Sequence, residues 1–342
     1  MAGGVIIADQ IEFNRLARTL HKLMNPQAYI DLCNESFDVD TDAAGTKPAA
    51  GQWVHTEIPG NSSKRIMMPL TQLGLFAQSK ILPLRNLNGL SLEFELSSNA
   101  SEWLNTGGQT PPSFALSDVS LKCSMLTLDS GLESAIGSKL LSGVELPLAQ
   151  REYITMTQVL TSGTFDLQLT RGLSRLTNIF VTFERPYAEG TGDDGAAATA
   201  NTLENNTNPP EMNLYYPTAA GDVPEWQLNI SSKKFPSFPV RSRTEAYYRL
   251  RQAMCAQGSH LHNYGMSFKE FTSNSYIVSL DCERECSAAF TGFTMRNGAQ
   301  VFFTMNNLHD PADSSKFPTK AYLTLAYESM ITISDSGITV LE

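Results

Sequence analysis

The chain has 342 residues, of which 42% are hydrophobic and 18% are charged, and its formal net charge is −10. This length suffices for two domains. Charged residues make up about 25% of an average protein, and a lower share is typical of a chain that buries part of its surface against partners. Neither terminus carries a run of basic residues, and nucleic-acid-binding proteins neutralise phosphates with clustered lysine and arginine, so we expect no direct nucleic-acid binding.

The cysteines are odd in number and scattered, which argues against a disulfide framework and favours a reducing compartment. They are Cys33, Cys123, Cys255, Cys282 and Cys286. The N-terminal segment MAGGVIIADQ has no basic region and no long apolar run, so we expect no signal peptide. No stretch approaches the roughly 18 apolar residues that a membrane-spanning helix needs.

An amphipathic helix is expected near the N-terminus, within an arm at residues 1–30. Asp9 is placed to cap it, and Glu12 follows at the capping-box spacing. Apolar residues then recur at helical intervals from Phe13 to Met24, with basic residues on the other side. Such a helix either packs on its own domain or forms an arm that meets an inner membrane or a neighbouring subunit.

Beyond residue 50 the apolar period changes to two, as in strands with one buried and one wet face. The alternation is unbroken at 90–96, after an Asn-Gly turn signal, and at 119–125. Further strands are expected at 53–58, 66–72, 144–148, 153–159, 165–169 and 179–183, and a helix at 130–141. We assign residues 31–187 to a first β domain.

Residues 188–222 differ in kind, with six acidic residues and no lysine or arginine. The segment is rich in alanine, glycine, asparagine, threonine and proline, so it cannot bury enough apolar surface to offset the entropy of ordering it. We interpret it as an exposed acidic loop or linker between two halves.

Strands resume at 226–230, and a second helix is expected over 243–256. Ser242 and Glu245 form a capping-box pair at its start. Strands are then expected at 266–271, 275–281, 300–306, 321–327, 330–334 and 338–341. We assign residues 223–342 to a second β domain with nearly the strand count of the first.

Two sets of about eight short strands with few helices predict an all-β chain of two tandem eight-stranded antiparallel jelly rolls. A faint internal repeat favours duplication. Gly172-Leu-Ser174 precedes the strand at 179–183, and Gly292-Phe-Thr294 precedes the strand at 301–305.

One group of residues resembles a metal site: His260-x-His262 with Cys282 and Cys286. Zinc takes four nitrogen or sulfur ligands in a tetrahedron, usually with a Cys-x2-Cys pair. Here the cysteines are spaced Cys-x3-Cys and the histidines lie in an expected loop. We therefore expect surface histidines and buried cysteines, and no metal ligands.

Catalytic motifs are missing from the sequence. It has no G-x-S-x-G, no H-E-x-x-H and no phosphate-binding loop. The adjacent acids Asp193 and Asp194 lie in the acidic segment, where solvated side chains are expected. We predict no catalytic residue, no cofactor and no enzymatic activity. A group of basic residues at the second helix either forms a solvated face or meets an acidic partner. They are Arg241, Arg243, Arg249 and Arg251.

Four segments resemble major capsid proteins of double-stranded DNA viruses, of the Polinton-like and protist-associated type. GLSRLTNIFVTF (172–183) is similar to a Ser-Arg-hydrophobic-Asn strand entry of that family. AFTGFTMRNGAQVFFTM (289–305) looks like its counterpart in a second jelly roll, with Thr294 and Met295 in place of Ser-Arg. The other two are LSDVSLKCSMLTLDSGLESAIGSKLLSG (116–143) and KKFPSFPVRSRTEAYYRLRQAMCAQGS (233–259).

The resemblance implies a structural virion protein with two side-by-side jelly rolls. Three copies would form a pseudo-hexagonal capsomer of an icosahedral capsid assembled inside the host cell. Expected partners are sister copies, neighbouring capsomers, minor capsid and penton proteins, and an inner membrane through the N-terminal helix. The alternatives are a single-jelly-roll capsid protein of a small virus, a β-sandwich module that binds carbohydrate or another ligand, and a glycan-active enzyme.

Overall fold

The computed structural model describes residues 5–23, 63, 65–68, 70, 73–77, 82–87, 89–96, 115–169, 172–173, 175–184, 224–230, 233–254, 266–268, 271, 276–283, 292–295, 301–308, 317–335 and 337–341. The helices are α1 (Phe13–Leu23), the 3-10 turn η1 (Leu84–Leu87), α3 (Ser130–Leu141) and α4 (Arg243–Ala253). The strands are β1 (Leu146–Val159), β2 (Phe165–Leu169), β3 (Leu176–Glu184), β4 (Glu225–Ile230), β5 (Lys233–Val240), β6 (Val278–Asp281), β7 (Val301–Asn306), β8 (Lys320–Ser334) and β9 (Gly337–Leu341).

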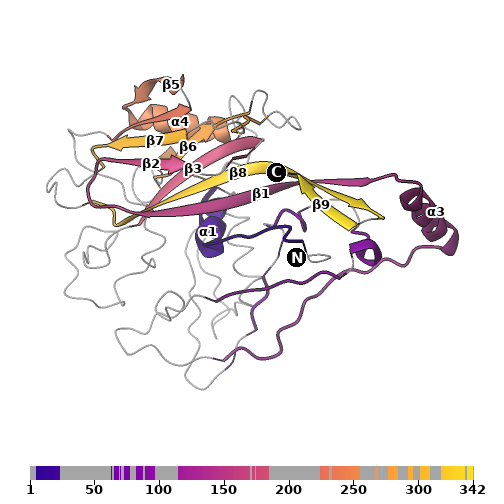
Figure 1. Ribbon diagram of the computed structural model, residues 1–342. Coiled ribbons are helices and arrows are strands. Elements are labelled where there is room, and N and C mark those ends of the chain that lie inside the picture. Colours follow the sequence, from indigo (N-terminus) through magenta and orange to yellow (C-terminus); the bar gives the residue numbers. More distant parts are fainter. Residues whose placement is uncertain are drawn as a thin grey trace.

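The described strands form two antiparallel sheets. One has the order β1-β8-β3-β6, with β9 paired to β8, and the other has the order β2-β7-β4-β5. From β1 to β8 the chain changes sheet at each step except between β4 and β5, which are neighbours in one sheet. This is the strand order of an eight-stranded jelly roll. Figure 1 shows β8 running beside β1 and β3, while β7 lies beside β2.

In the described part of the chain the all-β class, the jelly-roll topology and the small number of helices are confirmed. The predicted division into domains needs a correction, because strands from both sides of 188–222 alternate in each sheet. For example, β8 pairs with both β1 and β3, and β2 pairs with β7. The acidic segment thus connects β3 to β4 within one jelly roll. The described strands form one jelly roll, and the second one stays a prediction.

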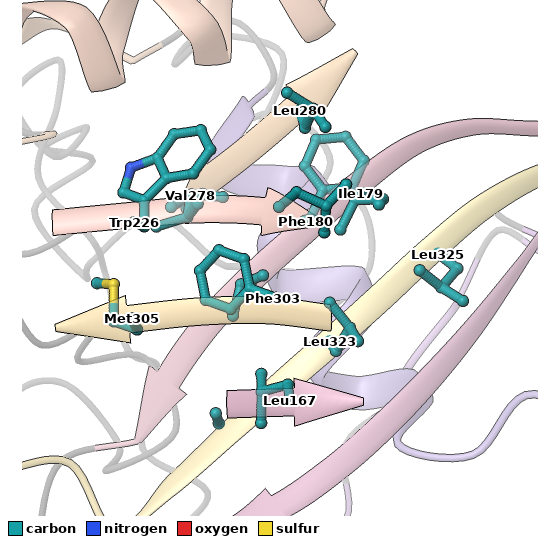
Figure 2. Packing of buried hydrophobic residues seen from close by; sticks show 14 of the residues in the cluster. Leu167, Ile179, Phe180, Trp226, Val278, Leu280, Phe303, Met305, Leu323 and Leu325 are labelled. Atoms are coloured by element: carbon teal, nitrogen blue, oxygen red, sulfur yellow. The ribbon is translucent and has the colours of Figure 1, made fainter. Parts of the chain in front are cut away.

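The core lies between the two sheets. Across the four-stranded sheet, Leu167 on β2 pairs with Phe303 on β7, which pairs with Leu228 on β4. Figure 2 shows Trp226, Phe303 and Leu167 on these strands and Ile179 and Leu323 on the facing sheet. All of these side chains are buried. Apolar residues at every second position of β7 point into this core, so the period-two pattern in the sequence predicts the strand faces correctly.

Two helices begin as predicted. The Asp129 carboxylate accepts a hydrogen bond from the Gly131 N–H at the start of α3, at 3.0 Å. The Ser242 hydroxyl accepts one from the Glu245 N–H at the start of α4, also at 3.0 Å. By contrast, α1 begins at Phe13, so Asp9 is not its cap, and Glu12 has a positive φ of 57°. Residues Leu16 and Leu23 of α1 are buried in the chain itself.

Several predicted strands differ in extent. The pairs 144–148 with 153–159, and 321–327 with 330–334, are single long strands, β1 and β8. Segments 90–96 and 119–125 are described without a strand ladder, and the predicted strand at 53–58 lies outside the described residues. Strand β5 was not predicted, because Pro236 and Pro239 disfavour a strand. Proline is tolerated there because β5 lies at the end of its sheet.

The N-terminal part packs on the long strands of the five-stranded sheet. Ile7 and Leu75 join a small core with residues of β1, β8 and β9: Leu148, Ile331, Ile333 and Ile338. The Gln10 amide donates a hydrogen bond to the buried Glu152 carboxylate of β1, at 3.1 Å. Gly74 lies so close to β1 that a Cβ would be 2.1 Å from the Arg151 carbonyl oxygen. The turn at 73–77 therefore requires glycine at this contact.

Candidate functional site

The two segments that carry the strand-entry resemblance lie together. Leu176 at the start of β3 forms a bridge with Phe293, and the Met295 N–H donates to the Leu173 carbonyl at 2.6 Å. A Cβ on Gly292 would lie 2.6 Å from the Arg175 carbonyl carbon. These segments were predicted as counterparts in two barrels. They are instead neighbours in one barrel, and the repeated glycine at 292 permits a close backbone crossing.

A polar cluster joins β1, β3, α4 and β6 beside this crossing. The Arg151 guanidinium on β1 donates to Thr177 Oγ1 at 3.0 Å and to Asn178 Oδ1 at 2.7 Å. It also forms an ion pair with Glu283, with a distance of 2.9 Å between Nη2 and Oε1. The Asn178 amide donates to the Ala253 carbonyl at the end of α4. The cluster holds four elements in register, and sequence reasoning missed it because its members are far apart in the chain.

Two titratable groups on β6 and just after it have raised pKa values. Burial raises the pKa of Asp281, although the Glu283 N–H donates to its carboxylate and the Arg151 charge acts in the opposite direction. Burial also raises the pKa of the Cys282 thiol, and the charges of Asp281 and Glu283 raise it further. A thiol held in the neutral form is a poor nucleophile and a poor metal ligand.

The Asp281 shift predicts a pH dependence of stability. Because the pKa of Asp281 is higher in the folded state than its ordinary value of 3.8, its contribution to stability is fully present below that value and is lost as pH rises through the folded pKa. We expect Asp281→Asn to gain stability relative to the parent as pH rises from about 4 to about 7. Urea unfolding at each pH measures this difference, and a difference that falls over that interval would contradict the assignment.

The predicted metal group does not assemble in the part of the chain that the structure describes. Among those residues no group of three or more His, Cys, Asp or Glu side chains is placed to hold a metal ion. Cys282 is described, whereas His260, His262 and Cys286 lie outside the described residues, as do Asp193 and Asp194. Likewise, no described helix is long and apolar enough to cross a membrane.

A long segment with exposed apolar side chains precedes β1. Residues 115–129 run extended without a ladder, and α3 follows at the far end of the molecule from β5 (Figure 1). Val119 is 83% exposed and Met125 is 73% exposed. The exposed large apolar residues between positions 115 and 144 are Leu116, Val119, Leu121, Met125, Leu126, Leu128, Leu132, Leu141 and Val144. Monomeric proteins rarely leave such a concentration uncovered. We call residues 115–129 the extended segment.

A second exposed surface lies on β5 and α4. Phe238 is 83% exposed, and Phe235 and Tyr248 are also exposed. Residues 233–254 contain six basic side chains and one acidic one, in a chain of net charge −10. Two of the predicted basic residues have partners in the same chain. Arg241 forms a two-pronged ion pair with Glu225, and Arg249 lies 3.6 Å from the Glu245 carboxylate. We call β5 with its exposed lysines and phenylalanines the β5 surface.

No protein-family model and no curated protein matches the chain. Among solved structures it is similar to VP54 of the virus PBCV-1, fitted into a reconstruction of the virophage Sputnik, with 9% identity over 63% of this chain and 55% of that chain and a TM-score of 0.41. It is also similar to the PBCV-1 capsid, with 10% identity, the same coverage and a TM-score of 0.38. The Sputnik virophage structure matches with 10% identity over 58% and 39%, and a TM-score of 0.33.

The chain spans about half the length of the PBCV-1 structures that it matches. At identities of 9–10% the likeness concerns the fold and leaves function to be argued from the surface of the chain itself.

Proposed function

We propose that this chain is a structural capsid subunit that self-associates into homotrimeric, pseudo-hexagonal capsomers of an icosahedral virus shell. The observation that carries the proposal is the exposed apolar surface of the extended segment and α3, on a chain that folds as a jelly roll. The sequence resemblance to major capsid proteins is the reason for proposing trimeric capsomers. The chain acts in the virion, after assembly inside the host cell, and acts by packing against copies of itself rather than by catalysis.

The exposed apolar surface is large enough to drive association. Burying one large apolar side chain that is otherwise in water contributes about 1.5–3 kcal/mol. The exposed apolar residues of 115–144 together offer several times that free energy. This is comparable to the entropy cost of association, about 4–15 kcal/mol. The low share of charged residues in the chain supports the same reading, since cores of subunit interfaces are depleted in charge.

The second jelly roll of a pseudo-hexagonal capsomer would be built from residues before β1. The segment at 90–96 has the alternation of a sheet-forming strand. Further proposed partners are neighbouring capsomers, minor capsid and penton proteins, and an inner membrane. Because α1 buries Leu16 and Leu23 within the chain, the exposed Ile6 and Ile11 before it are better placed for such contacts.

A single-jelly-roll capsid subunit is the second candidate. It is favoured by one observation, which is that β1 to β8 complete one eight-stranded barrel from residues 146 to 334. Electron micrographs of the purified oligomer distinguish the two candidates, because a trimer of double barrels has a pseudo-hexagonal outline and a trimer of single barrels has a triangular one.

Self-association is tested by substitution in the extended segment. We expect Val119→Ser/Leu121→Ser/Met125→Ser to raise the concentration at which the oligomer dissociates by at least about a hundredfold, since three apolar side chains lose their burial. Stability of the subunit should change by no more than about 0.5 kcal/mol, because these residues are exposed. Sedimentation across a dilution series measures the dissociation.

The matched control is Ser120→Ala/Ser124→Ala on the alternate positions of the same segment. It should leave dissociation unchanged. Equal effects of the two variants, or a triple variant that associates like the parent, would refute an interface at this segment.

A further inference from the structure

We propose that N-terminal segments and β9 form a latch that opens and closes independently of the jelly-roll core. The latch consists of residues 5–11, the turn at 73–77 and β9, packed on the ends of β1 and β8 at 146–150 and 329–334. The inference goes beyond the proposed function, because it concerns a movement within one chain and needs no second copy.

Two separate apolar clusters lie along the long strands β1 and β8. The main core between the sheets contains Leu325 of β8, whereas the small core of the latch contains Leu148 of β1 and Ile331 of β8. Counted among the described residues, the main core has 32 buried apolar side chains, the small core has six, and no residue belongs to both. Parts of a protein with few buried apolar contacts open at the lowest free energy, so the small core should open first.

A buried polar layer separates the two cores. Gln150 and Glu152 follow Leu148 at alternate positions on the same face of β1, and both are buried. The Gln150 amide donates to Ser329 Oγ on β8 at 3.0 Å, and the Gln10 amide donates to the Glu152 carboxylate at 3.1 Å. The apolar surface along this face is thus interrupted, which allows one core to open while the other stays packed.

β9 replaces β3 as the neighbour of β8 at this end of the sheet. β3 pairs with β8 from Lys320 to Tyr327, and β9 pairs with it from Met330 to Ser334. Figure 1 shows β9 beside the end of β8, away from β2 and β7. A two-stranded ribbon alone is marginally stable, so release of β9 weakens the whole three-stranded end. While closed, β9 also covers a backbone edge of β8 that a further strand could otherwise join.

The turn at 73–77 is seated directly against β1. A Cβ on Gly74 would lie 2.1 Å from the Arg151 carbonyl oxygen and 2.7 Å from Glu152 Oε1. Leu75 of this turn and Ile338 of β9 are both buried in the small core. The turn and β9 are far apart in the chain, so linked opening of the two would report the core that they share.

Hydrogen exchange of the full chain, followed in separate peptides by mass spectrometry, tests the latch. The amides of Phe76 and Ala77 are hydrogen-bonded within the turn, and β9 is paired to β8. Ile338→Ala removes an apolar side chain from the small core. We expect exchange in the turn and in β9 to rise together by about thirtyfold or more, with all variants at one protein concentration.

Phe303→Ala is the deciding variant, because it weakens the main core and leaves the contacts of the small core in place. If the latch opens by itself, its closed and open states are destabilised equally, so exchange in the turn and in β9 stays within about twofold of the parent. Exchange in the central strand β4 rises by about a hundredfold or more. If Phe303→Ala does not fold, Ile179→Val in the main core makes the same comparison, with a rise in β4 of about two- to tenfold.

Two results would overturn the latch. One is a rise of the same factor in the turn, in β9 and in β4 when the main core is weakened, because the chain would then open only as a whole. The other is a response to Ile338→Ala in β9 that the turn does not share. Neither result bears on self-association, which is measured by the mass of the oligomer, and a monomeric chain would leave the latch standing.

Discussion

Replacement of Phe303 by alanine is expected to lower the free energy of unfolding by about 3–5 kcal/mol. Phe303 is buried at the centre of β7, paired with Leu167 of β2 on one side and Leu228 of β4 on the other. Its ring lies 6.2 Å from that of Trp226. Truncation leaves a cavity between the two sheets that the paired strands cannot close. Urea unfolding followed by tryptophan fluorescence measures the loss.

The neighbouring Phe302 supplies the control, because it is on the other face of the same strand and is only partly buried. Phe302→Ala should cost clearly less than Phe303→Ala. An equal loss of unfolding free energy in the two variants would contradict the assignment of Phe303 to the core face of β7 and of Phe302 to the outer face.

Arg151→Leu is expected to destabilise the chain by about 2–3 kcal/mol, less than a fully buried pair because the arginine side chain is 47% exposed. The change removes the ion pair to Glu283, whose side chain is 6% exposed, and the hydrogen bonds to Thr177 and Asn178. Each of those acceptors is held in the polar cluster between β1, β3 and β6. Thermal and urea unfolding measure the loss.

The exposed pair between Arg85 and Glu133 is the matched control. Arg85→Leu should cost at most about 1 kcal/mol, since water already solvates both groups. A double-mutant cycle with Arg151→Leu and Glu283→Gln should show coupling of about 1 kcal/mol or more. If Arg151→Leu costs no more than Arg85→Leu, the cluster does not hold the strands together.

Period-two alternation predicted β2, β4 and β7 almost to the residue, because each has one face in the core and one outside it. The helix predicted over 243–256 begins with the predicted Ser242 cap, a bond between residues three positions apart, and ends at Ala253; the helix predicted at 130–141 lies at those residues. Such patterns depend only on residues that are close together in the chain, so they can be recognised without knowledge of any distant contact.

The parts that could not be predicted depend on which strands meet. An alternating strand looks the same whether its partner is 20 or 170 residues away, so the acidic segment at 188–222 was taken for a domain boundary. The register of β8 against β1, with Leu325 opposite Ile154, shows that the barrel closes across it. For the same reason the Arg151 cluster gave no signal, since its members lie up to 132 residues apart.

The sequence predicted only part of the two exposed apolar surfaces, the extended segment and the β5 surface. The alternation at 119–125 predicted a strand with one buried face, whereas the structure leaves both its faces exposed. Among the described residues no strand pairs with this segment, so its strand pattern has no covering partner there. The β5 surface gave no strand signal, since two prolines interrupt it.

The most direct test of the account is the mass of the intact purified chain at micromolar concentration, measured by native mass spectrometry. The account predicts a dominant species at three times the 37.5 kDa of one chain. A species at 37.5 kDa that persists as the concentration is raised would contradict it.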